Sequence, residues 1–552
     1  MEFTSVNKIF EAAFKKNWER PAISNYQGVT LKFGDVARRM EKLHIMFEEC
    51  GLQKGDKVAL CSRNQANWAV AFLATMTYGA VPVPLLHEFK SSNIHHLVNH
   101  SEAKILFVDD VIWEGLSETE MPDLQAIIQV NTFKLLYAAD EKIVDAREHL
   151  NELFGRKYPN AFTSDALDYY EDSADELAVI NYTSGTSGFS KGVMIPYRAI
   201  LSNIHFARTV LPGLDHTKSV VSMLPSAHMY GLMFELLYEL SVGAHVHFLS
   251  RVPSPKIIMK ALSEVKPYVV IAVPLVIEKI YKNKVKPILE KEGVKFLMKV
   301  PGVNQVIMNK IKTELINAFG AEFYEVIIGG AAFNKEVETF FKKMGFPFTV
   351  GYGMTECAPI ITYDDWKEEK LFSCGKAAPN MEVRINSADP ANIPGEIQIK
   401  GANVFLGYYK NEEATAEVFT EDGWFRTGDM GVLDEDGCLF IKGRAKCMIL
   451  GPSGQNIYPE EVETVLNSQP YVVDSLVIED NGGLTALIYP DVAQGTKDGI
   501  RQRDFQKYFD ERLAELNKEL PNYAKLKKIE ILSEDFERTP KKSIKRYLYQ
   551  RS

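Results

Sequence analysis

The feature that most constrains the fold is the alternation of short apolar runs with helical segments in the first half of the chain. Residues 57–62 and 104–109 (KVALCS and KILFVD) predict strands, and residues 67–78 between them predict a buried helix. Apolar strands separated by helices are typical of a parallel sheet that is covered on both faces. The pattern resumes at residues 268–274 and 325–328. A doubly wound α/β architecture is therefore expected.

The sequence pattern changes after Cys374. Short alternating segments separated by turn signals predict a small antiparallel, β-barrel-like subdomain. Beyond about residue 446, a helix at residues 459–466 and two strands flanking residues 480–483 (DNGG) predict a small α+β unit. The chain has 552 residues, and single cores stop growing at roughly 250–300 residues, so more than one domain is expected. Residues 110–172 are acidic and irregular, and their pattern predicts no particular helix or strand.

Charge and cysteine usage narrow the class of protein. The net charge of −10 argues against nucleic acid as a partner. Six cysteines are scattered without zinc-like or redox spacing, which is typical of reduced thiols in a cytoplasmic protein. The longest apolar run, residues 68–86, contains two prolines and a glycine and predicts a buried helix and strand rather than a spanning helix. The N-terminus has no apolar signal-peptide core, so no signal peptide is expected.

The strongest local motif is residues 182–192, YTSGTSGFSKG, directly after the apolar strand at residues 178–181. Gly185 and Gly188 allow the backbone to turn its N–H groups toward one point, the hydroxyl side chains add donors, and Lys191 adds a positive charge. Such a loop suits a polyphosphate, although it does not fit the Walker A pattern. The alternative from composition alone is a flexible surface loop.

This loop resembles the phosphate-binding motif of the adenylate-forming enzymes, a family that includes acyl-CoA synthetases, luciferases and peptide-synthetase adenylation domains. Four further segments resemble motifs of that family and occur in the family's order. They are residues 351–356 (GYGMTE, adenine and magnesium), 423–429 (GWFRTGD, ribose), 443–446 (GRAK, interdomain hinge) and 456–461 (NIYPEE). Five motifs in the correct order make coincidence very improbable.

The resemblance implies ATP-dependent activation of a carboxylic acid to an acyl-adenylate, followed by transfer to coenzyme A, with magnesium as cofactor. It implies an ATP- and acyl-binding N-terminal domain, residues 1–445, and a mobile α+β C-terminal domain, residues 446–552. The resemblance implies Lys191, His228 and Glu356 as catalytic residues, with Glu356 also the magnesium ligand, and we add Lys542 as a catalytic residue by hypothesis. The implied nucleotide-binding residues are Thr183, Ser184, Gly185, Thr186, Gly330, Ala331, Tyr352, Gly353, Thr355, Asp429, Arg444 and Lys446.

The chemistry of these residues agrees with the resemblance. Glu356 supplies a hard oxygen ligand of the kind magnesium takes. Asp429 can accept hydrogen bonds from both ribose hydroxyls, and Gly330 would let a flat base approach the backbone. The alternatives are a solvated acid for Glu356, a turn aspartate for Asp429, a plain strand-to-helix turn at Gly330 and a packed side chain for His228.

The C-terminal end departs from the family pattern. The family usually has Thr-Pro-x-Gly-Lys-Ile-x-Arg, whereas residues 539–546 read TPKKSIKR, with Ser543 at the position of the adenylation lysine. Our hypothesis is that Lys542 substitutes; the alternatives are Lys541, or heavier reliance on Lys191 and the metal. The basic run from residue 541 to 551 would meet coenzyme A phosphates or form a solvated tail.

The acid is expected to carry an apolar tail. Residues 229–234 (MYGLMF) contain no acid before Glu235, which disfavours an α-ammonium group, and the hinge region most resembles long-chain fatty-acyl-CoA synthetases. A long-chain fatty acid is therefore the expected substrate, and peripheral contact with a membrane to collect it stays open. The alternatives are an acyl-adenylate ligase that loads a carrier protein and a nucleotide-binding protein that has lost turnover. The sequence does not define the oligomeric state.

Overall fold

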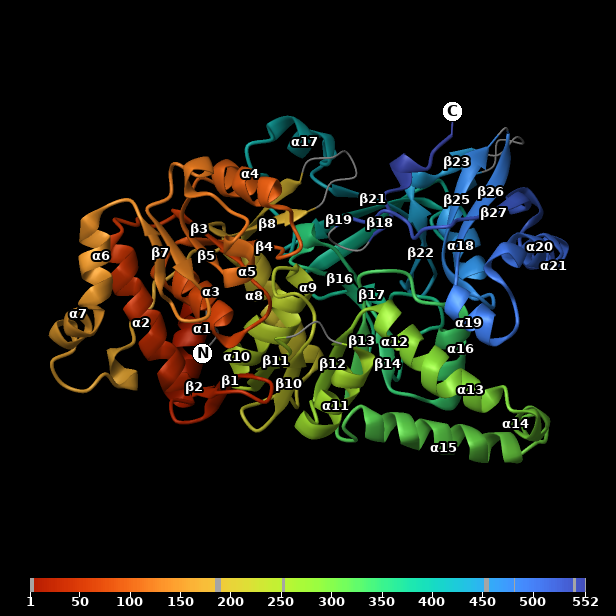
Figure 1. The fold of residues 1–552 in the computed structure, drawn as a ribbon, viewed down its shortest axis with the longest axis horizontal. Coiled ribbons are helices and arrows are strands. Elements are labelled where there is room, and N and C mark those ends of the chain that lie inside the picture. The colour runs from red at the N-terminus through yellow and green to blue at the C-terminus, as the bar shows by residue number, and fades with distance from the viewer. Residues whose placement is uncertain are drawn as a thin grey trace.

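The computed structural model describes residues 4–183, 190–250, 254–450, 456–480, 482–539 and 543–551 (Figure 1). A large α/β N-terminal part is followed by a smaller α+β C-terminal part, drawn in blue at the right of Figure 1. The predicted fold class is confirmed. Within the described ranges, no helix is both long and apolar enough to cross a bilayer.

The first sheet contains the strands that the sequence predicted. Its strand order is β4-β3-β5-β6-β7, and the first four strands are parallel. The strands are β3 (Lys57–Cys61), β4 (Val81–Leu85), β5 (Ala103–Val108), β6 (Ala126–Gln129) and the antiparallel β7 (Leu135–Ala138). Helix α3 (Ala66–Tyr78) is buried almost throughout, as its uniformly apolar sequence predicts. The irregular region after residue 110 in fact holds β6, β7 and the helices α6 (Glu141–Glu148) and α7 (Leu150–Lys157).

A second group of parallel strands consists of β12 (Val269–Ala272), β13 (Glu325–Ile328) and β14 (Phe348–Val350). Ala272 pairs with Ile328, and Ile328 pairs with Val350, so the three carboxyl ends lie level. Ligands of open α/β sheets bind outside such ends. A ligand-binding site is therefore expected at this edge of the sheet.

A further mixed sheet has the order β10-β11-β1-β2. Its strands are β10 (Ser219–Ser222), β11 (His245–Phe248), β1 (Pro21–Asn25) and β2 (Thr30–Lys32). Helices that share the largest apolar core with these sheets are α1 (Val6–Lys16), α2 (Phe33–Glu49), α8 (Tyr197–Val210) and α10 (Tyr238–Val242).

One antiparallel sheet has the order β15-β16-β17 and consists of β15 (Tyr352–Gly353), β16 (Ile360–Tyr363) and β17 (Lys376–Ala377). Two further antiparallel sheets complete the described N-terminal part. One has the order β18-β19-β21-β22 and corresponds to the region where the sequence pattern changes. Its strands are β18 (Met381–Asn386), β19 (Gly395–Gly401), β21 (Phe425–Leu433) and β22 (Leu439–Arg444). The other has the order β20-β9-β8 and is built from β8 (Leu177–Thr183), β9 (Lys191–Pro196) and β20 (Gly407–Tyr408).

The C-terminal part contains its own apolar core. Strands β25 (Val472–Asp480) and β26 (Gly483–Pro490) form the predicted hairpin, and β27 (Leu526–Ile531) adds parallel to β26. Helices α18 (Pro459–Asn467), α20 (Phe505–Asp510) and α21 (Leu513–Glu519) cover it. Phe505, Phe509 and Leu516 of the predicted apolar stripe are buried there, so that stripe is core packing. The exact boundary at residue 446 stays a prediction.

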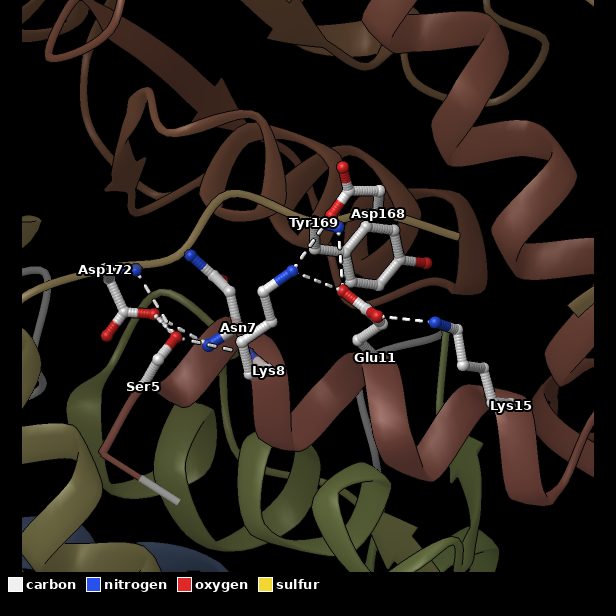
Figure 2. A network of polar contacts seen from close by, with 8 residues as sticks. All are labelled: Ser5, Asn7, Lys8, Glu11, Lys15, Asp168, Tyr169 and Asp172. Carbon is white, nitrogen blue, oxygen red and sulfur yellow. Dashed lines mark hydrogen bonds and ion pairs between the residues drawn. The ribbon is translucent and has the colours of Figure 1, made fainter. Parts of the chain in front are cut away.

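The start of the chain is anchored to the segment that precedes β8. The buried carboxylate of Asp172 accepts hydrogen bonds from the Ser5 hydroxyl at 2.6 Å and from the backbone N–H of Asn7 at 2.8 Å (Figure 2). It also accepts from the backbone N–H of Val6 at 3.0 Å. Glu11 accepts from the backbone N–H of Tyr169 at 2.9 Å. The first turn of α1 is thereby fixed to the connection that leads into β8.

Candidate functional site

The aligned carboxyl ends of β13 and β14 bring two predicted segments together. Gly330 and Ala331 follow β13 and are exposed, and residues 351–356 follow β14. Gly330 has φ +89°, a conformation that favours glycine, and a Cβ added there would lie 3.8 Å from Val273 Cγ1, an ordinary contact distance. Gly353 must be glycine for another reason, because a Cβ would lie 2.3 Å from the carbonyl oxygen of Pro359.

Asp429 lies in a three-residue polar cluster beside this edge. The hydroxyl of Tyr352 donates to Asp429 Oδ2 at 2.6 Å, and Arg444 Nε lies 3.1 Å from Asp429 Oδ1. Asp429 and Arg444 face each other across β21 and β22, and Asp429 is only 6% exposed. Burial and the adjacent carboxylate raise the pKa of Tyr352 well above its ordinary value, so its phenol stays a donor. This buried carboxylate is fixed by two partners from separate segments.

A second cluster joins Glu356, Tyr408 and Lys191. Glu356 lies in the short 3-10 helix η5 (Thr355–Cys357), is 9% exposed, and accepts a hydrogen bond from the Tyr408 hydroxyl at 3.0 Å. The ammonium of Lys191 lies 4.6 Å from the centroid of the same Tyr408 ring, a cation–π distance. Burial and Glu356 raise the pKa of Tyr408, which keeps the phenol protonated. One tyrosine therefore contacts both an acid and a base of the predicted site.

The predicted phosphate loop connects two paired strands. Thr183 at the end of β8 pairs with Lys191 at the start of β9, and the Thr183 hydroxyl lies 3.5 Å from the Lys191 carbonyl. The two ends of the loop are thus held together as a β-hairpin. The predicted residues Ser184, Gly185 and Thr186 lie outside the described residues, as does Lys542.

The segment that carries His228 lies against both of these regions. His228 immediately precedes helix α9 (Met229–Leu232). Asn181 of β8 donates to the Ala227 carbonyl at 2.9 Å, and the Tyr230 hydroxyl donates to the Ile327 carbonyl of β13 at 3.0 Å. A Cβ added to Gly329 would make a tight contact of 3.3 Å with the Tyr230 ring. The structure therefore brings His228 to the edge that holds the other predicted residues.

A buried carboxyl group holds that segment in place. Glu235, in the π-helix η3 (Met233–Leu237), accepts from the Ser222 hydroxyl and from the backbone N–H groups of Met223 and Leu224, all on Oε2 at 2.9–3.1 Å. Burial raises the pKa of Glu235 well above its ordinary value. The sequence indicated Glu235 only as the first acid after the apolar run, not as a support for residues 222–224.

The hinge segment lies at the exposed edge of β22. Lys446 is exposed in the 3-10 helix η6 (Ala445–Cys447), directly after the Arg444 that pairs with Asp429. A side chain on Gly443 would lie 2.8 Å from a carboxylate oxygen of Glu460 in α18. Strand β22 and the C-terminal part are therefore in close contact at this position.

The basic C-terminal run is largely engaged in ion pairs. Lys545 pairs with Glu537, Arg546 with Glu463, and Arg551 with Glu530. Ser543 is exposed, and its carbonyl accepts from the Thr539 N–H at 2.8 Å. These three basic residues belong to the folded C-terminal part and do not form a free cationic tail.

Tyr408 and Tyr230 were not predicted from the sequence. Tyr408 lies 217 positions after Lys191 in the chain and 52 after Glu356, so no local spacing relates it to them. Tyr230 could have been suspected, because it follows His228 by two residues. Across the described residues, no group of three or more His, Cys, Asp or Glu side chains could hold a metal.

Comparison with known proteins gives a consistent result. The model of the AMP-binding enzyme family matches residues 10–409, and that of the AMP-binding enzyme C-terminal domain matches residues 448–551. A long-chain-fatty-acid–CoA ligase of Mycobacterium bovis is 27% identical over 543 residues, covering 90% of this chain and 86% of that protein.

Two solved structures share the fold. ATP-bound MatB from Rhodopseudomonas palustris superposes with a TM-score of 0.76 at 23% identity, covering 99% of this chain and 98% of that one. The o-succinylbenzoate coenzyme A synthetase of Bacillus subtilis, in complex with ATP and magnesium, gives 0.73 at 22% identity, covering 98% of both chains.

Proposed function

This chain belongs to the AMP-binding enzyme family, and we propose that it is an ATP-dependent acid–thiol ligase. It converts a carboxylic acid and ATP to an acyl-adenylate and pyrophosphate, and then transfers the acyl group to coenzyme A with release of AMP. The acid that we propose is a long-chain fatty acid, supported by the ligase of Mycobacterium bovis and by the apolar run before Glu235.

The observation that carries this proposal is the continuous set of contacts among the predicted residues. Tyr352 connects the segment after β14 to Asp429, Tyr408 connects Glu356 to Lys191, and Tyr230 connects the His228 segment to β13. A ribose, a triphosphate and a carboxylate could be contacted together only if these chain regions lay side by side.

The roles follow from charge and hydrogen-bonding capacity. Asp429 accepts hydrogen bonds from ribose hydroxyls, and Tyr352 and Arg444 hold it in place. Lys191 supplies positive charge for the phosphates as negative charge builds up on the leaving pyrophosphate. We propose that His228 helps to orient the carboxylate of the acid. That carboxylate is ionised at neutral pH, since ordinary carboxyl pKa values lie near ~4, and it needs positioning rather than a base.

The residues fit a magnesium ion carried by the nucleotide. Among the described residues, Tyr408 is the only hydrogen-bond donor to the Glu356 carboxylate, so the carboxylate retains capacity for a cation. Magnesium commonly takes one or two protein carboxylates and completes its shell with phosphate oxygens and water, which agrees with the finding that the described residues form no cluster of metal ligands. When bound, magnesium would neutralise phosphate charge.

In the second step, the thiol of coenzyme A attacks the acyl-adenylate. Any group of the C-terminal part that assists loss of the thiol proton must be something other than a histidine. A thiol has an ordinary pKa near ~8.5, and no histidine follows His247. We propose that rotation about the hinge at Lys446 brings the C-terminal domain, residues 446–552, into its second position. We also propose that Lys542 supplies the adenylation charge in place of Ser543, and that the protein acts in the cytoplasm with peripheral contact to a membrane.

The test is pyrophosphate release with ATP and magnesium across acids from acetate to oleate, with and without coenzyme A. We expect release that increases with chain length and an acyl-CoA product only when coenzyme A is present. Lys191→Ala and Asp429→Ala should each lower the rate by about a hundredfold or more, whereas the exposed Lys16→Ala should not.

Each other outcome has a distinct meaning. Pyrophosphate release without an acyl-CoA product, but with loading of a phosphopantetheine carrier protein, would replace coenzyme A by a carrier. Release that favours short or aromatic acids would refute the long-chain substrate but keep the ligase. No release with any acid, together with retained ATP binding, would indicate a protein that has lost turnover. A wild-type rate of adenylate formation by Lys542→Ala would exclude that residue as the substitute.

A further inference from the structure

A helical arm projects from the parallel strands β12 and β13. It starts within the π-helix η4 (Tyr281–Val285), runs through α13 (Lys286–Leu289) and α14 (Glu292–Leu297), and continues into α15 (Val303–Ala318). Figure 1 shows α14 at the outer end of this arm, at the lower right, away from the sheets. We refer to residues 284–312 as the arm.

The tip of the arm exposes apolar side chains. Phe296 is 70% exposed, the most exposed aromatic side chain of the described residues, and Leu297 beside it is 41% exposed. Val306, in the first turn of α15, is 68% exposed. Met308, Ile311 and Leu315 on the same helix are buried. The inner face of α15 therefore packs on the protein, and Phe296, Leu297 and Val306 do not contribute to the core.

The charge of the arm is opposite to that of the protein. The arm contains seven lysines and two glutamates, a formal charge of +5 in a chain of net charge −10. None of the seven lysines has an ion pair with a described residue. Lys291, Lys295 and Lys299 are exposed and flank the apolar tip directly. Such unpaired positive charge is available to a negatively charged surface.

We propose that the arm is a membrane-docking surface that binds anionic phospholipid bilayers, with Phe296 and Leu297 inserted among the acyl chains. Lysines beside exposed apolar side chains suit the surface of a bilayer. The cations can contact the phosphates of the headgroup region, and the apolar side chains can enter the boundary of the hydrocarbon region beneath it. An acidic protein partner would satisfy the lysines but would not require this apolar tip. The proposal is independent of which acid the enzyme activates.

The experiment is co-sedimentation of the full chain with vesicles, without any substrate. One set of vesicles contains equal parts of phosphatidylcholine and phosphatidylglycerol, and the other contains phosphatidylcholine alone. We expect binding to the anionic vesicles that weakens as salt is raised, and at least about tenfold weaker binding to the neutral ones. Phe296→Ser with Leu297→Ser, and Lys291→Glu with Lys295→Glu and Lys299→Glu, should each weaken binding by about tenfold or more.

Matched controls separate the arm from general surface effects. Val29→Ser replaces an apolar side chain that is 72% exposed at a different place. Lys16→Glu with Lys134→Glu and Lys343→Glu changes net charge equally at exposed positions outside the arm. Both controls should bind like wild type, and all variants should melt at the wild-type temperature. Equal losses in control and arm variants, or no binding of wild type to anionic vesicles, would overturn the proposal.

Discussion

At the scale of single residues, Tyr408 is the position where two charges of the site meet. Its hydroxyl donates to Glu356 and its ring lies under the ammonium of Lys191. The backbone around Glu356 is also fixed, because Asn203 accepts from the Ile360 N–H and donates to the Cys357 carbonyl. Because the hydroxyl contacts the carboxylate and the ring contacts the cation, substitutions of Tyr408 can remove the two contacts separately.

Tyr408→Phe removes only the hydrogen bond to Glu356, whereas Tyr408→Leu also removes the ring under Lys191. A buried hydrogen bond to a charged group contributes about 1.5–3 kcal/mol. We therefore expect Tyr408→Phe to raise the magnesium concentration for half-maximal pyrophosphate release by about tenfold, with little change in the KM for ATP. Tyr408→Leu should raise that KM as well. Identical magnesium and ATP profiles for the two variants would contradict this division of roles.

At the scale of elements, short buried contacts set the positions of whole segments. The π-helix η3 presents Glu235 to two successive backbone N–H groups at residues 223 and 224. Asn64 supports the same turn, accepting from the Ser226 N–H at 2.7 Å and donating to the Leu224 carbonyl. The segment leading to His228 thus depends on two polar side chains from other parts of the chain.

Glu235→Leu should move this segment, and Glu235→Gln should leave it in place. Burial raises the pKa of Glu235 and so favours its neutral form, and an amide reproduces the shape and the acceptor oxygen of that form. Leucine would leave two buried N–H groups without an acceptor, at about 1–3 kcal/mol each. We expect a higher KM for the acid in Glu235→Leu, with the ATP KM nearly unchanged, and near wild-type kinetics in Glu235→Gln. If glutamine behaves like leucine, the positioning role fails.

The anchor of α1 gives a second prediction at this scale. Asp172→Ala removes the acceptor of two N–H groups and one hydroxyl at a buried position, and should lower the free energy of unfolding by about 2–3 kcal/mol. Asp168→Ala is the matched control, because the Asp168 side chain is 92% exposed and, among the described residues, forms an ion pair only with Lys8. Its effect should stay below about 1 kcal/mol. Chemical denaturation of both variants distinguishes them, and equal losses would refute the anchor.

At the scale of the whole molecule, several buried carboxyl groups form no ion pair with a described residue. Glu235 and Glu239 are fully buried on consecutive helical turns, and neither oxygen of Glu239 has a hydrogen-bond partner in the described part of the chain. Burial raises the pKa of Glu239 to about 8 and that of Glu325 to about 8. The folded protein therefore holds protons at neutral pH that the unfolded chain releases.

The stability of the protein should consequently fall as the pH rises. Between the ordinary carboxyl pKa of 4.5 and the raised value of about 8 for Glu239, the unfolded state binds fewer protons than the folded state. The stabilisation from such a group is fully present below its pKa in the unfolded chain and is lost once the pH exceeds its pKa in the folded protein. Between these two pKa values, the free energy of unfolding falls by up to about 1.4 kcal/mol per pH unit for each such group. Urea unfolding at pH 5, 6, 7 and 8 should show this decline, and Glu239→Gln should make it shallower. An unchanged slope in that variant would place the titration elsewhere.

The fold was predictable wherever the local sequence of a segment, such as an apolar run or a pair of turn residues, indicated its secondary structure. The strands at residues 57–62, 104–109 and 325–328 are apolar on both faces, and the structure places them as β3, β5 and β13. The hairpin at Asp480 and Gly483 was predicted by its turn residues. The segment after residue 110 gave no such signal, because its strands are short and β7 is only half-buried. Strand β6 forms there because it pairs with β5, and local composition does not indicate it.

The sequence by itself determined the order of motifs, the α/β architecture and the chemical types available for the site. Only the tertiary structure decided which of these groups meet. Thr183 and Lys191 are adjacent because β8 and β9 pair, and Asp429 and Arg444 are adjacent because β21 and β22 pair. Tyr408 reaches Glu356 and Lys191 through the pairing of β20 with β9. The physical reason is that strand register and helix packing are set by burial of apolar surface over the whole chain, and local spacing contains no information about contacts between distant residues.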